Sequence, residues 1–473
     1  MNPSPPDWFE RYRDLVADWP AFMQCLRQPL SSALWCQSLD VTPARLVELA
    51  AADGLKLNPD PALPLAFRCT PDADLGRRWW YRAGLAHAQE IASQLPVHLL
   101  DPKPGERVLD LCAAPGGKTA QIAVRLEGLG TVVANDLVTG RLKALKDTLE
   151  RLGLANVSVT NADGAGIGGA AGGFDRVLVD APCSCEGTVR RAPLAAGTSQ
   201  APRYGEFARR QIALLSRGAA LCRPGGRIVY ATCTFAPEEN EAVVDAVLRL
   251  ADGALRVVPA SVPGFVSRPG LDAWEGHTFD ASLRTTLRVW PEDNDTGGFY
   301  VAVLEKAATA RGPELPGPIT AIDDEGFIAA ITERYGLPNA LTGAFLPVRA
   351  TGRGLSVIAR DHRPPRRPEP IAFGQAAVKR DAHAPVLRTA GARLWGRQAT
   401  RNVVELDAGG RDLYLARESA DLGNALPSDC DARGVVIVRH AGFALGLGWY
   451  DRAAGVVHSL LPKHRAVSEA APD

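Results

Sequence analysis

The sequence predicts an α/β protein whose centre is a doubly wound, mainly parallel β-sheet, accompanied by a small α+β domain and a C-terminal extension. From Arg107 onward, short runs rich in Val, Ile and Leu alternate with helical stretches, which is the pattern of repeated βαβ units. The chain has 473 residues and is therefore too long for one ordinary domain. Hydrophobic residues make up 46% and charged residues 22%, the balance of a globular protein with real cores.

The elements of the central domain are expected in a regular order. Strands are expected at 107–112, 131–136, 157–160, 176–180, 227–232 and 299–304, and helices at 117–127, 139–152, 206–222 and 238–251. Before them, helices are expected at 12–26, 42–53 and 85–95, the second because Thr42 can cap a helix that starts with proline. After Asn402, the runs VVEL, DLYLA, GVVIVRH, FALGLGWY and GVVHSLL follow at close spacing and predict a small β-barrel.

Changes in composition suggest where the domains begin and end. We expect an N-terminal α+β domain at 1–84, the central domain at 85–305, an Ala/Pro/Gly-rich linker at 306–318, a basic Pro-rich intermediate region at 319–400 and the barrel at 401–473. Within the intermediate region, HRPPRRPEPI at 362–371 is expected to be extended.

Several classes of protein are excluded or disfavoured. No apolar window of about 18 residues is present, so a membrane-spanning helix is not expected. The polar start MNPSPPDWFERYRD does not resemble a signal peptide, which favours a cytoplasmic protein with no membrane partner. Nine cysteines without a CxxC pair argue against a disulfide framework and a zinc ribbon, so no metal is expected.

The charge is balanced overall but not locally. The chain has 53 basic and 53 acidic residues, whereas 349–401 holds twelve basic and three acidic ones. A basic stretch on a neutral protein favours a phosphate-bearing partner, although a solvated loop explains it equally well.

The first predicted strand runs into a Gly-containing loop, LCAAPGGKT, which follows Asp110. This order of residues matches neither GxGxxG nor the P-loop, so a nicotinamide or nucleotide triphosphate site is disfavoured. With Asp136 at the end of the second strand, the pattern suits S-adenosylmethionine, because a carboxylate can accept hydrogen bonds from its ribose hydroxyls. Asp163 and Asp180 follow later strands at the same edge, where ligands gather, although each could simply cap a helix.

Two cysteines follow neighbouring predicted strands. Cys183 lies in DAPCSC and Cys233 lies in ATCT, so both thiols are expected over one edge of the sheet. A thiolate that adds to C6 of cytosine would make C5 nucleophilic toward a methyl donor, and a second thiol could help to remove the C5 proton. A buried structural cysteine is the alternative for each. We assign that structural role to the following cysteines: Cys25, Cys36, Cys69, Cys222 and Cys430.

The motifs VLDLCAAPGGKT, VANDLVTGRL, DAPCSCEG, LCRPGGRIVYATCT and PEENEAVV resemble those of the Sun/Nop RNA cytosine-C5 methyltransferases over about 85–305. The resemblance implies a Rossmann-like class I methyltransferase domain that uses S-adenosyl-L-methionine. It implies that Cys233 is the nucleophile, that Cys183 helps release the product, and that Asp180 and Lys118 support the active site. The cofactor would be held by Cys112, Ala113, Ala114, Pro115, Gly116, Gly117, Lys118, Asp136, Arg141, Asp163 and Asp180.

The layout of the whole chain is similar to that of the bacterial RsmF-type branch, which methylates 16S ribosomal RNA and ends in a PUA-like barrel. A monomer whose partner is ribosomal RNA or the small ribosomal subunit is therefore expected. Transfer RNA is the alternative substrate. A non-catalytic RNA-binding assembly factor and a nicotinamide-dependent dehydrogenase are the rival functions. Two departures from the family pattern stand out: Trp35 to Ser38 replace Arg-x-Asn-Thr, and Cys185 replaces a glycine.

Overall fold

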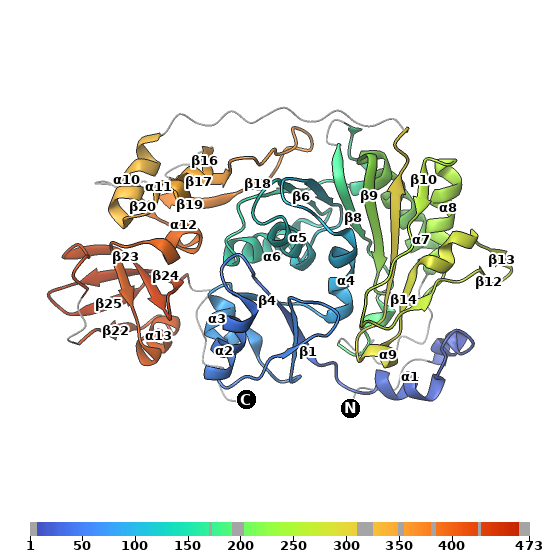
Figure 1. The fold of residues 1–473 in the computed structure, drawn as a ribbon, viewed down its shortest axis with the longest axis horizontal. Coiled ribbons are helices and arrows are strands. Elements are labelled where there is room, and N and C mark those ends of the chain that lie inside the picture. The colour runs from blue at the N-terminus through green and yellow to red at the C-terminus, as the bar shows by residue number, and fades with distance from the viewer. Residues whose placement is uncertain are drawn as a thin grey trace.

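The computed structural model describes residues 7–169, 173–191, 203–309, 325–348, 354–379, 385–423 and 427–462. Figure 1 shows the C-terminal strands beside helices α2 (Pro43–Ala52) and α3 (Trp79–Arg82) of the N-terminal part, with the central sheet on the other side. Within the described ranges, no helix has the length and apolar character needed to cross a membrane.

The central sheet is doubly wound and mainly parallel, as predicted. Its strand order is β11-β14-β15-β9-β8-β5-β6-β7-β18, with β10 beside β15. The five neighbouring strands β9, β8, β5, β6 and β7 run parallel. Strands β15, β14 and β18 are antiparallel to the strands beside them. Their bounds are β5 (Arg107–Asp110), β6 (Thr131–Asn135), β7 (Val157–Thr160), β8 (Phe174–Asp180), β9 (Cys222–Thr232), β10 (Leu255–Val257), β11 (Arg268–Pro269), β14 (Leu287–Val289), β15 (Phe299–Lys306) and β18 (Ala372–Phe373).

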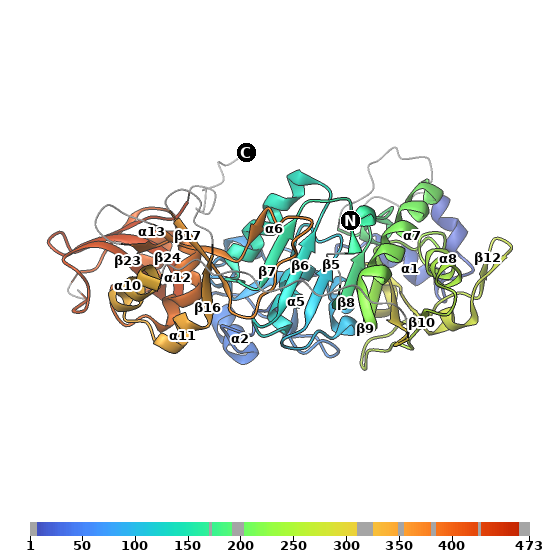
Figure 2. The same cartoon turned by 90° about the horizontal axis from the view of Figure 1, so that it is seen from above.

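Helices cover both faces of this sheet (Figure 2). On one face lie α4 (Ile91–Leu100), α5 (Gly117–Arg125) and α6 (Thr139–Arg151), whose apolar residues share one core with the strands. On the other face, α7 (Tyr204–Leu221) and α8 (Glu241–Ala251) form a second core. Because apolar side chains of β5, β6, β8, β9 and β15 alternate between the two cores, the middle of the sheet is buried on both faces, as parallel sheets require.

The N-terminal part confirms the small sheet and corrects two predicted helices, because the helix expected at 12–26 begins only at Trp19 and the one expected at 85–95 begins only at Ile91. A sheet of order β2-β3-β1-β4 contains β1 (Ser32–Cys36), β2 (Asn58–Pro59), β3 (Ala66–Cys69) and β4 (Ala86–Ala88), and η1 (Asp7–Tyr12) and α1 (Trp19–Leu26) precede it. Thr42 caps α2 as expected. The helix expected at 85–95 is wrong: β4 pairs with β1, and α4 starts only after Glu90, whose carboxylate accepts from the Ser93 N–H. The prediction ended this helix before Pro96, whereas Pro96 lies inside α4.

The intermediate region forms its own sheet of order β16-β17-β19-β20. It consists of β16 (Phe345–Val348), β17 (Gly354–Ala359), β19 (Gln375–Lys379) and β20 (Val386–Leu387), with α10 (Glu325–Tyr335), α11 (Asn339–Gly343) and α12 (Thr389–Trp395) around it. Residues 362–371 form neither helix nor strand, as predicted. Strand β18, which follows them, joins the central sheet beside β7. The predicted linker begins at the end of β15, and 310–318 lie outside the described residues.

The C-terminal part is a sheet of order β21-β23-β24-β25-β22. Its strands are β21 (Val403–Glu405), β22 (Ser419–Asp421), β23 (Arg433–His440), β24 (Phe443–Asp451) and β25 (Val456–Ser459). The predicted strand DLYLA is wrong: it lies in α13 (Ala408–Leu415), which Asp407 caps by accepting from the Gly410 N–H. Strands β21 and β22 are not paired with each other in the described residues, so the closed PUA-like barrel stays a prediction.

The N-terminal and C-terminal parts share a hydrophobic core. Leu34 and Trp80 belong to the same buried cluster as Tyr414 and Leu445. At its edge, Trp79 meets His440 edge to face with ring centroids 4.7 Å apart. The two ends of the chain therefore stabilise one another rather than folding as separate appendages.

Candidate active site

The loop after β5 is shaped by a buried acid and a glycine. Asp110 ends β5, and its Oδ2 accepts from the Thr119 hydroxyl at 2.7 Å; burial raises the pKa of Asp110 to about 7. Gly116 has φ +108, and a Cβ there would lie 2.7 Å from Leu145 Cδ1. Because a side chain fits neither this backbone nor this space, the loop can pass close to α6 only with glycine at this position.

Asp136 fixes the same loop from the neighbouring strand. Its side chain is buried, its Oδ2 accepts from the Ala114 N–H at 3.0 Å, and its Oδ1 accepts from the Val138 N–H at 2.9 Å. Arg141 lies 3.6 Å from Asp136 Oδ2 and donates to the Ala114 carbonyl. The structure thus brings together Asp136, Arg141 and the predicted 112–118 loop.

Two apolar side chains beside Asp136 were missed by the sequence analysis. Leu137 and Val138 are 46% and 48% exposed, which is unusual for such residues next to a buried acid. Their position directly after the acid of the second strand could have signalled an apolar wall for a ligand. A carboxylate and an apolar surface side by side suit the ribose and adenine of an adenosyl group.

The side chain of Asp163 acts as a helix cap, which is the simpler of the two interpretations of this residue. Its Oδ1 accepts from the Ala165 N–H at 3.1 Å and caps a short 3₁₀ turn, and its side chain is exposed. Its contact with an adenine stays a prediction. Asn161, which the sequence analysis did not single out, ties this segment to the Asp136 end of β6, because its Nδ2 donates to the carbonyls of Asp136 and Leu137 at 2.8 and 2.9 Å.

The two predicted thiols meet above β8 and β9. Cys183 Sγ and Cys233 Sγ are 3.4 Å apart, and the parallel pairing of Asp180 with Ala231 sets their register. Cys183 is buried and Cys233 is partly buried. The pKa of Cys183 is raised by its hydrogen bonds to Cys185 and Cys233 and by burial. For Cys233, the hydrogen bond with Cys183 acts in the opposite sense, but Cys185 and burial raise the pKa overall.

An ion pair lies next to these thiols. Lys118 Nζ donates to Asp180 Oδ2 and to Ser93 Oγ, both at 2.8 Å. Burial opposes the charged ammonium, but attraction to Asp180 outweighs it and raises the pKa of Lys118. Lys118 is therefore charged, and the predicted pair of supporting residues is assembled in the structure.

A buried carboxylate joins the two cysteine loops. Glu186, only three residues after Cys183, accepts from the hydroxyls of Tyr12 at 2.9 Å, Tyr204 at 2.6 Å and Thr234 at 2.9 Å. Thr234 directly follows Cys233, and its hydroxyl is also 2.7 Å from that of Ser184. The sequence pattern did not predict a role for Glu186. The one feature that could have indicated it is the position of this acid close to a cysteine at the end of a strand.

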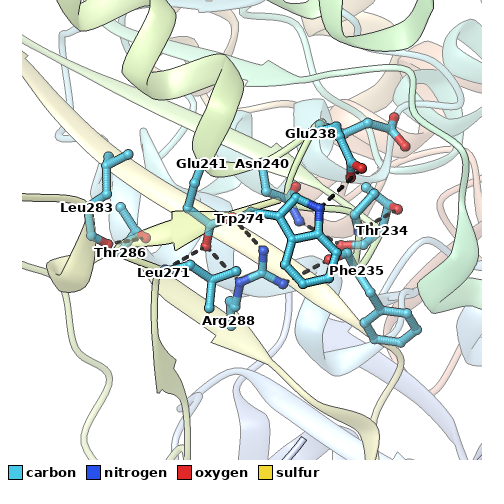
Figure 3. Close-up of polar contacts among 12 residues, drawn as sticks. Thr234, Phe235, Glu238, Asn240, Glu241, Leu271, Trp274, Leu283, Thr286 and Arg288 are labelled. Carbon is cyan, nitrogen blue, oxygen red and sulfur yellow. Dashed lines mark hydrogen bonds and ion pairs between the residues drawn. The ribbon is translucent and has the colours of Figure 1, made fainter. Parts of the chain in front are cut away.

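A second buried carboxylate acts on the same loop through an arginine (Figure 3). Arg288 Nε donates to Glu241 at 2.7 Å, and its Nη1 donates to the Phe235 carbonyl at 2.8 Å. Asn240 Nδ2 donates to the Thr234 carbonyl at 3.0 Å. The backbone immediately after Cys233 is therefore held by charged and amide side chains in a place that water does not reach.

The altered N-terminal motif turns inward. Trp35 is buried and its indole N–H donates to Gln89 at 2.9 Å. Gln37 is also buried, and its Nε2 donates to the Leu152 carbonyl of the central domain at 3.1 Å. Trp35 therefore packs inside the protein, and Gln37 contributes to the contact with the central domain.

A doubly wound sheet with a Gly-containing loop after β5 and a buried acid at the end of β6 is the fold of a class I S-adenosylmethionine-dependent methyltransferase. Residues 97–305 match the family model described as 16S rRNA methyltransferase RsmB/F. The tRNA (cytosine(49)-C(5))-methyltransferase of Pyrococcus abyssi is 40% identical over 235 residues, which cover 50% of this chain and 75% of that protein.

Ribosomal RNA small subunit methyltransferase F of Klebsiella pneumoniae is 35% identical over 305 residues, which cover 63% of this chain and 61% of that protein. This chain therefore spans less than two thirds of that relative's length. Among solved structures, a methyltransferase homologue from Pyrococcus horikoshii matches with a TM-score of 0.54 and 28% identity, covering 64% of this chain and 99% of that one. The chain belongs to the RsmB/F family of RNA methyltransferases, so the resemblance to the Sun/Nop enzymes is confirmed.

Proposed function

We propose that this protein methylates C5 of a cytosine in 16S ribosomal RNA with S-adenosylmethionine as methyl donor. The observation that carries the proposal is the pair of thiols 3.4 Å apart at the ends of two adjacent parallel strands. A protein that only binds RNA needs neither thiol, and a dehydrogenase would need a different loop after β5. We further propose that it acts in the cytoplasm as a monomer, without a metal ion.

The cofactor would lie against the 112–118 loop, with Asp136 toward the ribose and Leu137 and Val138 against the adenine. The donor set supports this placement, because Asp136 is a buried acceptor whose loop partner, Ala114, is held in place by a 3.0 Å hydrogen bond. Arg141 is 50% exposed on its side chain and could reach the carboxylate of the methionine moiety. When bound there, S-adenosylmethionine supplies the methyl group.

Cys233 is assigned as the nucleophile. Its thiolate adds to C6 of the cytosine, which breaks the C5=C6 double bond and places electron density on C5. Glu186 accepts from the Thr234 hydroxyl and Arg288 donates to the Phe235 carbonyl, and these two hydrogen bonds hold the neighbouring thiol in one position. The Lys118 ammonium stabilises the negative charge that develops on the ring, and its ion pair with Asp180 keeps it oriented.

Cys183 is assigned to product release. After methylation it takes the proton from C5, the C5=C6 double bond forms again, and the bond from C6 to Cys233 breaks. The target base must leave its stack for the thiol to approach C6 from the ring face. The N-terminal domain (1–84), the basic region (319–400) and the barrel (401–473) would then present the RNA to the site.

Transfer RNA is the second candidate substrate, and the 40% identity to a tRNA methyltransferase favours it. Bisulfite sequencing of total RNA from a strain that lacks this gene separates the two. We expect one cytosine in 16S RNA to lose its protection from bisulfite, and a plasmid copy should restore it. A loss confined to tRNA would replace the ribosomal assignment, and unchanged protection in both RNAs would contradict the methyltransferase activity itself.

A further inference from the structure

The backbone around Cys183 is held from both sides by a pair of polar side chains. Gln211 Nε2 donates to the Pro182 carbonyl at 3.0 Å, and Glu239 Oε2 accepts from the Ser184 N–H at 3.1 Å. The same Gln211 nitrogen donates to Glu239 Oε2 at 2.8 Å, so the two side chains form one unit, the Gln211–Glu239 clamp. The clamp therefore binds both peptide groups that flank the Cα atom of Cys183.

The two residues of the clamp come from other parts of the chain. Gln211 lies in α7, and Glu239 lies in the segment between β9 and α8. Tyr230 of β9 fixes this segment, because its hydroxyl donates to the Glu239 carbonyl at 2.6 Å. A helix, a strand and a connecting segment thus converge on the loop that carries Cys183.

The clamp is polar in a place that water does not reach. The side chains of Gln211 and Glu239 are fully buried, and burial raises the pKa of Glu239 to about 7. Both hydrogen bonds reach Oε2 of Glu239, so the carboxyl can accept them whether or not Oε1 carries a proton. Two apolar side chains of the same shape could fill this space at little cost in stability. The polar pair therefore points to a use other than stability.

We infer that Gln211 and Glu239 are positioning residues for the removal of the C5 proton by Cys183. The inference rests on the proposed function, in which Cys183 takes that proton as the bond from C6 to Cys233 breaks. By fixing the peptide groups on both sides of Cys183, the clamp limits where its sulfur can lie. Product release depends on this position, because a misplacement of about 1 Å can cost on the order of 100-fold in rate.

The loop of Cys233 is held by other side chains. Glu186 accepts from the Thr234 hydroxyl, and Arg288 donates to the carbonyl of the next residue. The clamp takes part in neither hydrogen bond. A change in the clamp should therefore slow the step that Cys183 performs more than the addition of Cys233 to C6.

The test separates formation of the covalent complex from its decay. The double variant Gln211→Leu with Glu239→Leu removes both polar side chains together, so neither is left buried without its partner. Methyl-tritiated S-adenosylmethionine is supplied with small ribosomal subunits and tRNA of the deletion strain, so that either RNA can serve as substrate. Denaturing gels then separate tritium in the protein–RNA complex from tritium in free RNA. We expect tritium to enter the complex at close to the normal rate and to leave it roughly 10- to 100-fold more slowly.

Two further variants serve as controls. Glu239→Gln retains the shape of the side chain and an acceptor oxygen, so it should release product at close to the normal rate. Asn156→Leu removes another fully buried amide, which donates to the carbonyls of Ala123 and Leu129 at 3.4 and 3.3 Å, before the start of β7. It should lower stability without accumulation of the complex. Equal accumulation in Asn156→Leu and in the double variant would overturn the inference, because loss of stability alone would then explain it.

Oxidation by diamide gives a measurement that needs no substrate. Diamide takes up two hydrogen atoms as the thiols of Cys183 and Cys233, 3.4 Å apart, form a disulfide, whose rate of formation mass spectrometry measures. We expect this rate to fall in the double variant. Product release at the normal rate in the double variant would overturn the inference. Absence of methyl transfer to either RNA by the unaltered protein, with slower oxidation in the double variant, would instead count against the proposed function.

Discussion

Asp136 illustrates how one side chain can hold both a loop and a ligand. It accepts from two backbone N–H groups, those of Ala114 and Val138, and remains 4% exposed. A carboxylate has more acceptor sites than these two bonds use, so the ribose hydroxyls can be added without breaking them. The sequence could predict this acid from its place at a strand end, but it could not predict Leu137 and Val138 as exposed neighbours.

We expect Asp136→Ala to weaken the binding of S-adenosylmethionine by about 1.5–3 kcal/mol, because a charge-assisted acceptor is lost and two N–H groups lose their partner. Isothermal titration calorimetry measures this directly. Asp14→Ala, which removes an exposed acid from the N-terminal segment, is the control and should bind the cofactor normally. Unchanged affinity in Asp136→Ala would remove the ribose assignment.

At the scale of elements, the loops that follow β8 and β9 are held in place by hydrogen bonds from buried charged side chains. The sequence predicted both strands, both cysteines and their common edge, because hydrophobic runs and parallel pairing follow simple rules. It did not predict Glu186, Glu241 or Arg288, because their partners are far away along the chain. It also missed α13, where a capping Asp407 outweighs the strand-like composition of DLYLA.

We expect Arg288→Met to destabilise the protein by about 3–5 kcal/mol, because the buried Glu241 carboxylate loses its partner. The side chains of Arg288 and Glu241 are 4% and 0% exposed, so water cannot replace the ion pair. Urea unfolding measures the loss. The double variant Arg288→Met with Glu241→Leu should recover most of it, and a double variant as unstable as the single one would contradict a charge-based explanation.

The docking of β18 on β7 should depend on pH through His362. His362 is fully buried, its Nε2 lies 2.8 Å from the Ser158 hydroxyl, and burial lowers its pKa to about 3. Because the folded protein binds this proton more weakly than the unfolded chain, stability falls as the pH drops below about 6.5, by up to roughly 1.4 kcal/mol per unit. Unfolding free energies measured from pH 7 to pH 5 should fall less steeply for His362→Asn. Parallel curves for the two proteins would show that this histidine does not contribute.

Across the whole molecule, the basic segment 362–371 and the thiols lie beside different strands of the central sheet. The Arg363 N–H donates to Thr131 at the start of β6 and the Ile371 N–H donates to Val159 of β7, whereas Cys183 and Cys233 follow the ends of β8 and β9. The sequence indicated a basic stretch but could not place it, because the pairing of β18 with β7 joins residues far apart in the chain.

We expect Arg366→Ala with Arg367→Ala to weaken RNA binding and to flatten its salt dependence by up to ~0.7–0.9 log units per lost phosphate contact. Both side chains are exposed, whereas Arg363 is part of the packing and is left unchanged. Binding to small ribosomal subunits at several salt concentrations gives the slope. The turnover rate at saturating RNA should stay the same, and an unchanged salt slope would mean that the segment is only a solvated loop.

The central claim is that two thiols 3.4 Å apart divide the reaction between them. Denaturing gels of Cys183→Ala and Cys233→Ala, incubated with substrate RNA and S-adenosylmethionine, test it most directly. Cys183→Ala retains the nucleophile but loses the group that removes the C5 proton, so it should accumulate a covalent complex with RNA that survives denaturation. Cys233→Ala should form neither complex nor product. A complex formed by Cys233→Ala and not by Cys183→Ala would reverse the two roles, and full activity without a complex in both variants would contradict the covalent mechanism.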